Sequence, residues 1–147
     1  MTNLQTQPQS QKPNPVKKLN TKVISFDVED YFQVAAFENQ CPTAEWENYD
    51  CRVESNVQKI LHLLNQSDTK ATFFILGWIA ERYPHLVKSI ANKGHEIASH
   101  GYFHQRINHL SQAQYREDVT TSKKLLEELT GQPVIGYRAP SFSFSEQ

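Results

Sequence analysis

Short apolar runs alternate with longer segments of helical periodicity along this sequence, and this alternation restricts the possible folds more than any other feature. The runs that we expect to be strands lie at residues 23–28, 71–76, 95–99 and 134–138. The expected helices lie at residues 53–66, at 79–92 with a break near Pro84, and from Ser111 to about Leu129. Such alternation predicts parallel βαβ units, and therefore an α/β fold whose chemistry collects at the carboxyl ends of the strands.

Several helix ends carry local signals. Ser111 and Gln114 have the spacing of a capping box, in which each side chain binds a free backbone N–H at the start of a helix. Gly94 and Gly131 follow helical segments at the position where a left-handed residue ends a helix. Pro84 suits the first turn of a helix. These signals predict where two helical segments begin and end, one from Pro84 to Gly94 and one from Ser111 to Gly131.

Composition excludes several classes of protein. The net charge of −1 and the hydrophobic content of 38% give no electrostatic case for nucleic-acid binding. No apolar run approaches the roughly 20 residues of a membrane span. Cys41 and Cys51 form no CxxC pair, so two free thiols in a reducing compartment are favoured over a disulfide. Residues 1–20 are polar, so we expect a disordered tail without a secretory signal, a cytoplasmic protein, and one domain over residues 21–147.

Three carboxylates follow the first strand within four positions. Asp27, Glu29 and Asp30 would repel one another unless they face open water or surround a cation. Side chains at i and i+2 share a face of an extended backbone, so Asp27 and Glu29 could point to one spot and Asp30 to another. A solvated turn remains an alternative at this point.

Residues 31–51 form a long aromatic and acidic connection, for which we expect a loop with one helical turn near residues 34–38. Long loops in compact domains are often functional. This loop could therefore lie over whatever Asp27 and Glu29 hold. Alternatively, its aromatic side chains simply cover one end of the core.

A second polar group follows the third expected strand. His100 and His104 are four positions apart, and Gly101 between them favours a loop or a single turn. A histidine pair at this spacing commonly holds a divalent metal, and a carboxylate from a neighbouring strand end would complete a hydrolytic metal site. Arg138 ends the fourth expected strand, so titratable residues gather at one rim of an apolar sheet.

These segments together resemble the polysaccharide deacetylases, the family 4 carbohydrate esterases with a NodB-type domain. The resemblance covers roughly residues 23–145 and is closest to the exosortase-associated exopolysaccharide deacetylase branch. The segments that carry it are SFDVED at 25–30, HGYFH at 100–104 and RAPSFS at 138–143. The fold implied by the resemblance is the N-terminal half of a distorted parallel (β/α) barrel.

The resemblance also implies roles for individual residues. Asp27 matches the catalytic base, and Arg138 matches the arginine that steadies its carboxylate. One divalent metal is implied, most readily zinc, although cobalt, iron, nickel and manganese suit the same donors. Its implied ligands are Glu29, His100 and His104, with Asp30 as the alternative to Glu29. Substrate contacts are expected at Tyr102, Pro140 and Ser141.

Two positions depart from the family pattern. Val28 stands where the family has the second of two adjacent aspartates, which moves the acidic ligand to Glu29 or Asp30. Gly101 replaces the serine or threonine that follows the first histidine, and this change removes a hydrogen bond from the loop.

The expected activity is the metal-dependent removal of N-acetyl groups from a polysaccharide or its precursor. Full (β/α) barrels need roughly 200 residues or more. We therefore expect these 147 residues to hold the N-terminal part of the domain, with the rest beyond Gln147 or on a separate chain. Two alternatives remain, a related hydrolase of small amides and an inactive remnant that at most binds metal.

Overall fold

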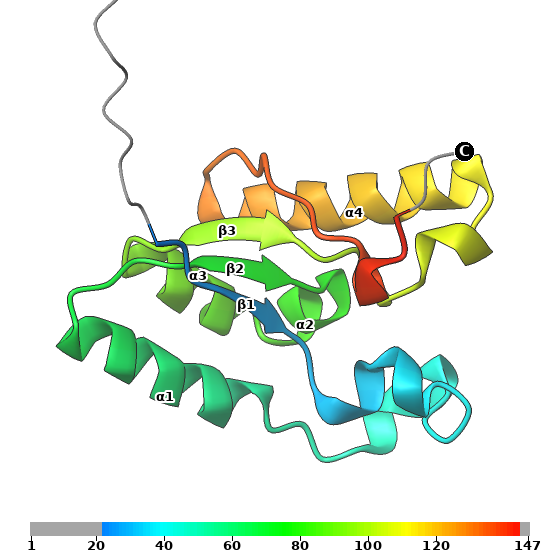
Figure 1. Ribbon diagram of the computed structural model, residues 1–147, viewed down its shortest axis with the longest axis horizontal. Helices are drawn as coiled ribbons and strands as arrows, with labels where there is room; N and C mark the ends of the chain where they lie inside the picture. The colour runs from blue at the N-terminus through cyan, green and yellow to red at the C-terminus, as the bar shows by residue number, and fades with distance from the viewer. Residues whose placement is uncertain (1–21, 145–147) are drawn as a thin grey trace, which may run out of the picture.

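The computed structural model describes residues 22–144, which fold around a three-stranded parallel sheet (Figure 1). The strands lie in the order β1-β2-β3, so each strand pairs with its neighbour in sequence. The strands are β1 (Ser25–Val28), β2 (Thr72–Ile75) and β3 (Glu96–Ser99). The helices are α1 (Val53–Gln66), α2 (Gly77–Arg82), α3 (Pro84–Asn92) and α4 (Gln112–Thr130). The expected polar tail at residues 1–20 lies outside the described residues.

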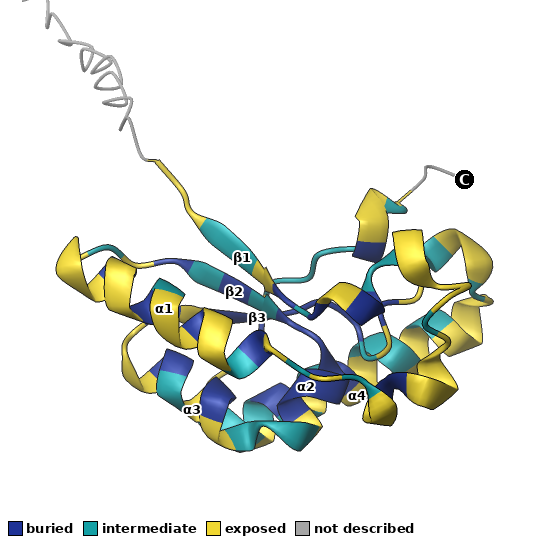
Figure 2. Ribbon diagram, turned by 90° about the horizontal axis from the view of Figure 1, so that it is seen from below, coloured by how far each residue is buried: buried dark blue, intermediate teal, exposed yellow. Residues whose placement is uncertain are grey.

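The helices cover one face of the sheet (Figure 2). This arrangement follows from the strand order, because right-handed crossovers that advance in one direction all pass over the same face. Phe73 and Ile75 of β2 point into this layer and are fully buried. They meet the apolar stripe of α1, to which Val57 and Leu61 belong. The α/β class with a parallel sheet is therefore confirmed.

The predicted fourth strand at residues 134–138 is wrong. This segment makes only an isolated parallel bridge, between Tyr137 and Ser99. The Ser99 N–H donates to the carbonyl of residue 136 at 2.9 Å, and the Arg138 N–H donates to the Ser99 carbonyl at 3.0 Å. The start of the segment is held by α4 instead, because the Val134 N–H donates to the Glu127 carboxylate at 2.9 Å. The helix therefore takes a backbone group that a continuous ladder would use.

The predicted helix signals are confirmed. Ser111 caps α4, and the Gln114 side chain completes the capping box. Gly94 and Gly131 adopt φ angles of 77° and 67°, in the left-handed region that favours glycine. Pro84 begins α3 after a break from α2. Among residues 22–144, no helix is both long and apolar enough to cross a lipid bilayer.

The connection at residues 31–51 contains three 3₁₀ helices, η1 (Tyr31–Gln33), η2 (Ala35–Phe37) and η3 (Thr43–Asn48). Phe32 and Trp46 are buried, and their rings lie 5.9 and 5.6 Å from the ring of Trp78 on α2. The aromatic residues thus cover one end of the core. Residues 34–36 instead line a cavity beside Asp27 and Glu29, so both expected roles of the connection are present.

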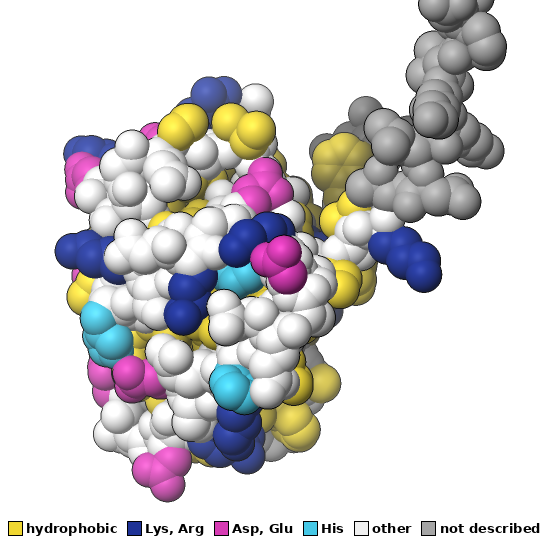
Figure 3. All heavy atoms as spheres, turned by 90° about the vertical axis from the view of Figure 1, so that its left-hand side faces the viewer, with side chains coloured by type: hydrophobic (Ala, Val, Ile, Leu, Met, Phe, Trp, Pro, Cys, Tyr) yellow, Lys and Arg dark blue, Asp and Glu magenta, His cyan; other side chains and the backbone are white. Residues whose placement is uncertain are grey.

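The carboxyl ends of the three strands point toward this connection and toward the segment at residues 139–144 (Figure 1). The opposite end of the molecule, which faces the viewer in Figure 3, carries acidic and basic side chains scattered among apolar ones. The polar side chains that the sequence singled out therefore meet at the end where parallel α/β sheets place their chemistry.

Candidate metal centre

One carboxylate and two imidazoles converge at the carboxyl ends of β1 and β3. Glu29 follows β1, while His100 and His104 lie on the loop that leaves β3. The Nε2 atoms of His104 and His100 lie 3.0 and 3.7 Å from the Glu29 Oε2 atom. One potential ligand atom from each residue lies within 4.8 Å of the other two. This separation suits three ligands around one cation.

His100 is held in a defined orientation by the backbone. Its N–H donates to the Ile75 carbonyl at the end of β2, at 3.0 Å. Its Nδ1 atom lies 2.8 Å from the Arg138 carbonyl oxygen, which can only accept, so Nδ1 carries the proton and Nε2 keeps its lone pair toward Glu29. Burial lowers the pKa of His100, which favours the neutral imidazole that binds metal.

The loop from 100 to 104 adopts an unusual backbone conformation. Gly101 has φ +77°, and His104 has φ +54° although it carries a side chain. Non-glycine residues in this region persist where the surrounding structure holds them, and such residues concentrate at functional sites. The glycine that departs from the family pattern therefore suits the left-handed backbone of this loop.

The polar atoms of this cluster fit a divalent cation. Glu29 Oε2 is buried and has no hydrogen-bond partner among the described residues. Glu29 Oε2 approaches His104 Nε2 closely, yet the two atoms do not form a hydrogen bond. Buried polar atoms without partners are rare in folded proteins, and a bound ion is one way in which such atoms are satisfied. Two imidazoles and one carboxylate are also a typical donor set of catalytic zinc sites.

A second carboxylate lies beside this cluster and is held by an arginine. The Arg138 guanidinium donates to Asp27 Oδ1 and, at 2.7 Å, to the Ser25 hydroxyl. It also lies over the ring of Phe74 of β2, with its central carbon 3.9 Å from the ring centroid. The other carboxylate oxygen, Asp27 Oδ2, lies 4.0 Å from His100 Nε2. Asp27 therefore offers one oxygen to Arg138 and the other to the cluster.

A cavity of about 290 Å³ opens over these residues. Residues 34–36 form one wall, and Ser141 and Phe142 form another. Ser141 and Phe142 have φ angles of 53° and 51°, and Phe142 is 85% exposed. Ser141 thus lies where a substrate contact is expected, whereas Pro140 is buried beneath it and does not line the cavity.

A model of the polysaccharide deacetylase family matches residues 42–147. The chain belongs to this family. It is 42% identical over 73 residues to a peptidoglycan-N-acetylglucosamine deacetylase of Bacillus cereus, covering 50% of this chain and 26% of the relative. It is 32% identical over 92 residues to a peptidoglycan deacetylase of Helicobacter pylori, covering 63% and 31%. The chain thus spans about a quarter to a third of these curated relatives.

Solved structures of this family share the fold. A peptidoglycan N-acetylglucosamine deacetylase superimposes with a TM-score of 0.64 at 28% identity, covering 84% of this chain and 48% of that chain. A family 4 carbohydrate esterase from Bacillus anthracis, described as a pseudoenzyme, superimposes with a TM-score of 0.62 at 29% identity, covering 63% and 33%.

Two residues that the resemblance to the deacetylases implicated lie away from the cluster. Asp30, the alternative metal ligand, is buried and accepts hydrogen bonds from the N–H groups of Tyr31, at 2.8 Å, and Arg52. Tyr102, an expected substrate contact, points toward α2, where its hydroxyl donates to Glu81 at 2.8 Å. Of the two possible acidic ligands, Glu29 is the one that the structure brings to the histidines.

Sequence reasoning missed two residues around this candidate site. Ser25 reads as strand composition alone, although its hydroxyl binds Arg138. Asp118 of α4 binds the loop that carries both histidines. Ser25 is polar and lies two positions before Asp27, so it faces the same side of β1, and this pattern could have indicated its place in the site. Asp118 gave no signal, because acidic residues are common on the exposed side of a helix.

Proposed function

We propose that this chain is part of a metal-dependent N-deacetylase, which removes acetyl groups from a polysaccharide or its precursor. The observation that carries the proposal is the cluster of Glu29, His100 and His104 beside the Asp27–Arg138 pair. The names of the Bacillus cereus and Helicobacter pylori relatives support a deacetylase acting on an acetylated glycan.

The chemistry of the proposal follows from the donor atoms. A divalent metal, most readily zinc, supplies a Lewis acid that polarises an acetyl carbonyl and makes water more acidic. Glu29 and the two Nε2 atoms would hold this ion. Asp27 Oδ2 accepts a proton from the attacking water, while Arg138 fixes the carboxylate through Oδ1. Water thereby adds to the acetyl carbon, the proton taken up by Asp27 passes to the amide nitrogen as the C–N bond breaks, and the products are acetate and the free amine.

The cavity supports an acyl substrate. Ala35 and Ala36 contribute small apolar side chains to its wall, within the same cavity as Asp27 and His104. A methyl group can pack against such side chains while the polar carbonyl faces the cluster. This arrangement is compatible with sugar N-acetyl groups and with small acetylated amides, so the substrate must be tested directly.

Two finer proposals concern the whole protein. We infer a place in the exosortase-associated exopolysaccharide branch, supported by the HGYFH and RAPSFS segments. We also infer that the sheet is part of a (β/α) barrel, supported by the parallel strand order and by the helices on a single face. Further strands would then cover the face that carries Asp27 and Phe74.

The test measures metal content and acetate release together. Wild type is compared with Glu29→Ala and with the double variant His100→Ala/His104→Ala. His62→Ala, on an exposed face of α1, and Glu117→Gln, on an exposed face of α4, are the matched controls. We expect about one metal per chain in the wild type and in both controls, and loss of the metal in the site variants. Acetate release from an N-acetylglucosamine oligomer and from a small acetylated amide then separates the two substrate classes.

The outcomes separate the alternatives. Metal binding with acetate release from the oligomer supports the proposal. Metal binding with release from the small amide alone favours the small-amide hydrolase. Metal binding without any acetate release means that these residues form the metal site but do not suffice for catalysis. Folded wild-type protein that binds no metal contradicts the ligand assignment and leaves the inactive remnant.

A further inference from the structure

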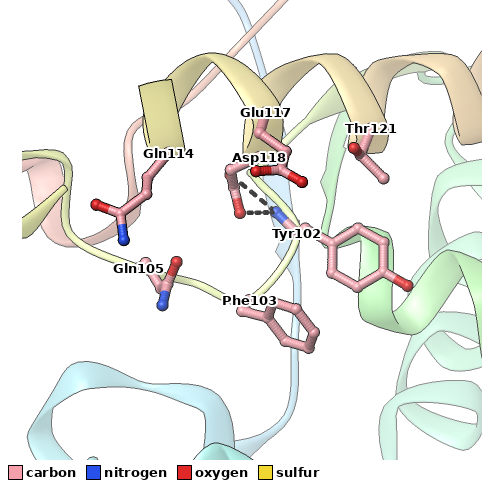
Figure 4. A pocket seen from close by; sticks show the side chains of 7 residues that line it. All are labelled: Tyr102, Phe103, Gln105, Gln114, Glu117, Asp118 and Thr121. Carbon is pink, nitrogen blue, oxygen red and sulfur yellow. Dashed lines mark hydrogen bonds between the residues drawn. The ribbon is translucent and has the colours of Figure 1, made fainter. Parts of the chain in front are cut away.

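Asp118 of α4 reaches over to the loop that carries both histidines. Its Oδ1 and Oδ2 atoms accept the Tyr102 N–H at 3.0 and 3.1 Å, as the dashed lines in Figure 4 show. The N–H of Phe103 also acts on this carboxylate, where it opposes the rise in pKa that burial causes. Successive backbone N–H groups that converge on one anion form a nest, and here the anion is part of the protein.

The same loop is held from its other side by α2. The N–H groups of Gly77 and Trp78 donate to the carbonyl oxygens of Gly101 and Tyr102, at 2.9 and 3.1 Å. The Tyr102 ring also packs against Gly77, where a β-carbon would lie 2.3 Å from the ring. The carbonyl groups of Gly101 and Tyr102 are therefore fixed by α2, and the amide of Tyr102 is fixed by Asp118.

The contact with Asp118 is tight and costs desolvation energy. A β-carbon on Gly101 would lie 2.7 Å from Asp118 Oδ2, so the loop closes directly against the carboxylate. Burial raises the pKa of Asp118, and the backbone N–H groups of Tyr102 and Phe103 oppose this shift. Among residues 22–144 the carboxylate has no ion-pair partner. Its interactions are thus directed to the loop backbone alone.

We propose that Asp118 is a positioning residue for the metal centre. It holds residues 101–103 in place, so that the Nε2 atoms of His100 and His104, on either side of them, converge on Glu29. The effect is indirect, because Asp118 touches neither imidazole. This inference rests on the metal site proposed above and assigns that site a supporting residue on a separate helix.

The test is a cobalt(II) titration of the 147-residue protein, followed by the visible absorption of the bound ion. Asp118→Asn removes the charge and leaves one acceptor oxygen, and Asp118→Ser keeps a smaller oxygen acceptor. Glu117→Gln is the matched control, since it removes a carboxylate from the same turn that makes no hydrogen bond to the loop among the described residues. Circular dichroism without metal checks the fold of each variant. We expect both Asp118 variants to bind cobalt at least ~10-fold more weakly, with an altered spectrum, while Glu117→Gln behaves as wild type.

Each other outcome overturns the inference in a recognisable way. Folded Asp118 variants with wild-type affinity and spectrum would show that the loop holds its histidines without the carboxylate. Loss of the fold in both variants would make Asp118 a structural residue. An equal loss of affinity in Glu117→Gln would point to a general charge effect. If the wild type binds no cobalt, the metal site itself fails, and the inference fails with it.

Discussion

Replacing Gly101 by alanine should destabilise the protein for two separable reasons. The first is the backbone, because Gly101 has φ +77° and a side chain there is strained. The second is the neighbouring carboxylate, because the new β-carbon would lie 2.7 Å from Asp118 Oδ2. Gly131→Ala provides a control, since Gly131 has φ +67° but no atom lies within 4 Å of its β-carbon position.

The expected size of the effect can be estimated from these two contributions. A left-handed alanine costs about 1–2 kcal/mol, which is the whole effect expected for Gly131→Ala. At Gly101 the carboxylate must also withdraw and lose its hydrogen bonds to the Tyr102 amide. Hydrogen bonds to charged groups are worth about 1.5–3 kcal/mol, so the total for Gly101→Ala is about 2.5–5 kcal/mol.

Urea unfolding followed by tryptophan fluorescence measures both variants, because Trp46 and Trp78 are buried in the native state. Gly101→Ala should lower the free energy of unfolding more than Gly131→Ala does. The excess should disappear when Asp118 is replaced by alanine in the same protein. Equal losses in the two glycine variants, or an excess that persists without Asp118, would refute this account of the loop.

Three further predictions follow from single contacts. Burial lowers the pKa of His95 below its usual 6.5. As pH falls, this histidine is therefore protonated in the unfolded chain before it is protonated in the folded one, so the free energy of unfolding decreases below about pH 6.5. In His95→Asn the urea midpoint should decrease less as pH falls, and a pH dependence equal to that of the wild type would contradict this prediction. Arg138→Lys should slow acetate release roughly 10- to 100-fold. Metal affinity should persist, because His100 binds the backbone of residue 138, and loss of metal would contradict this. Ser111→Ala should lower the free energy of unfolding by about 1 kcal/mol, whereas Ser111→Asp should not, and equal losses would exclude a capping role.

The parts of the fold that depend on local sequence could be predicted. Apolar runs located the three strands, and the Ser111–Gln114 spacing located the start of α4. The grouping of Glu29 with the two histidines was also predictable, because parallel strands bring their carboxyl ends to one edge. Each of these features depends on spacing along a few residues or on the general geometry of a parallel sheet.

Other features depend on partners far away in the sequence. The segment at 134–138 has the composition of a strand, but Glu127 of α4 takes the N–H of Val134. Tyr102 was expected to contact substrate, but the space beside Gly77 and the Glu81 carboxylate draw it toward α2. Tertiary contacts of this kind override local preference, and one sequence alone does not reveal them.

Arg138 joins the two halves of the candidate site through different parts of one residue. Its carbonyl oxygen binds the His100 ring, while its guanidinium binds Asp27, which is 111 positions earlier in the chain. The three proposed metal ligands all precede residue 105, so they are synthesised before Arg138. The order of synthesis therefore separates the proposed ligands from the partner of Asp27. A nascent chain therefore holds all three proposed ligands before it holds Arg138, and both the His100 ring and Asp27 are oriented only when the last described segment docks on β3.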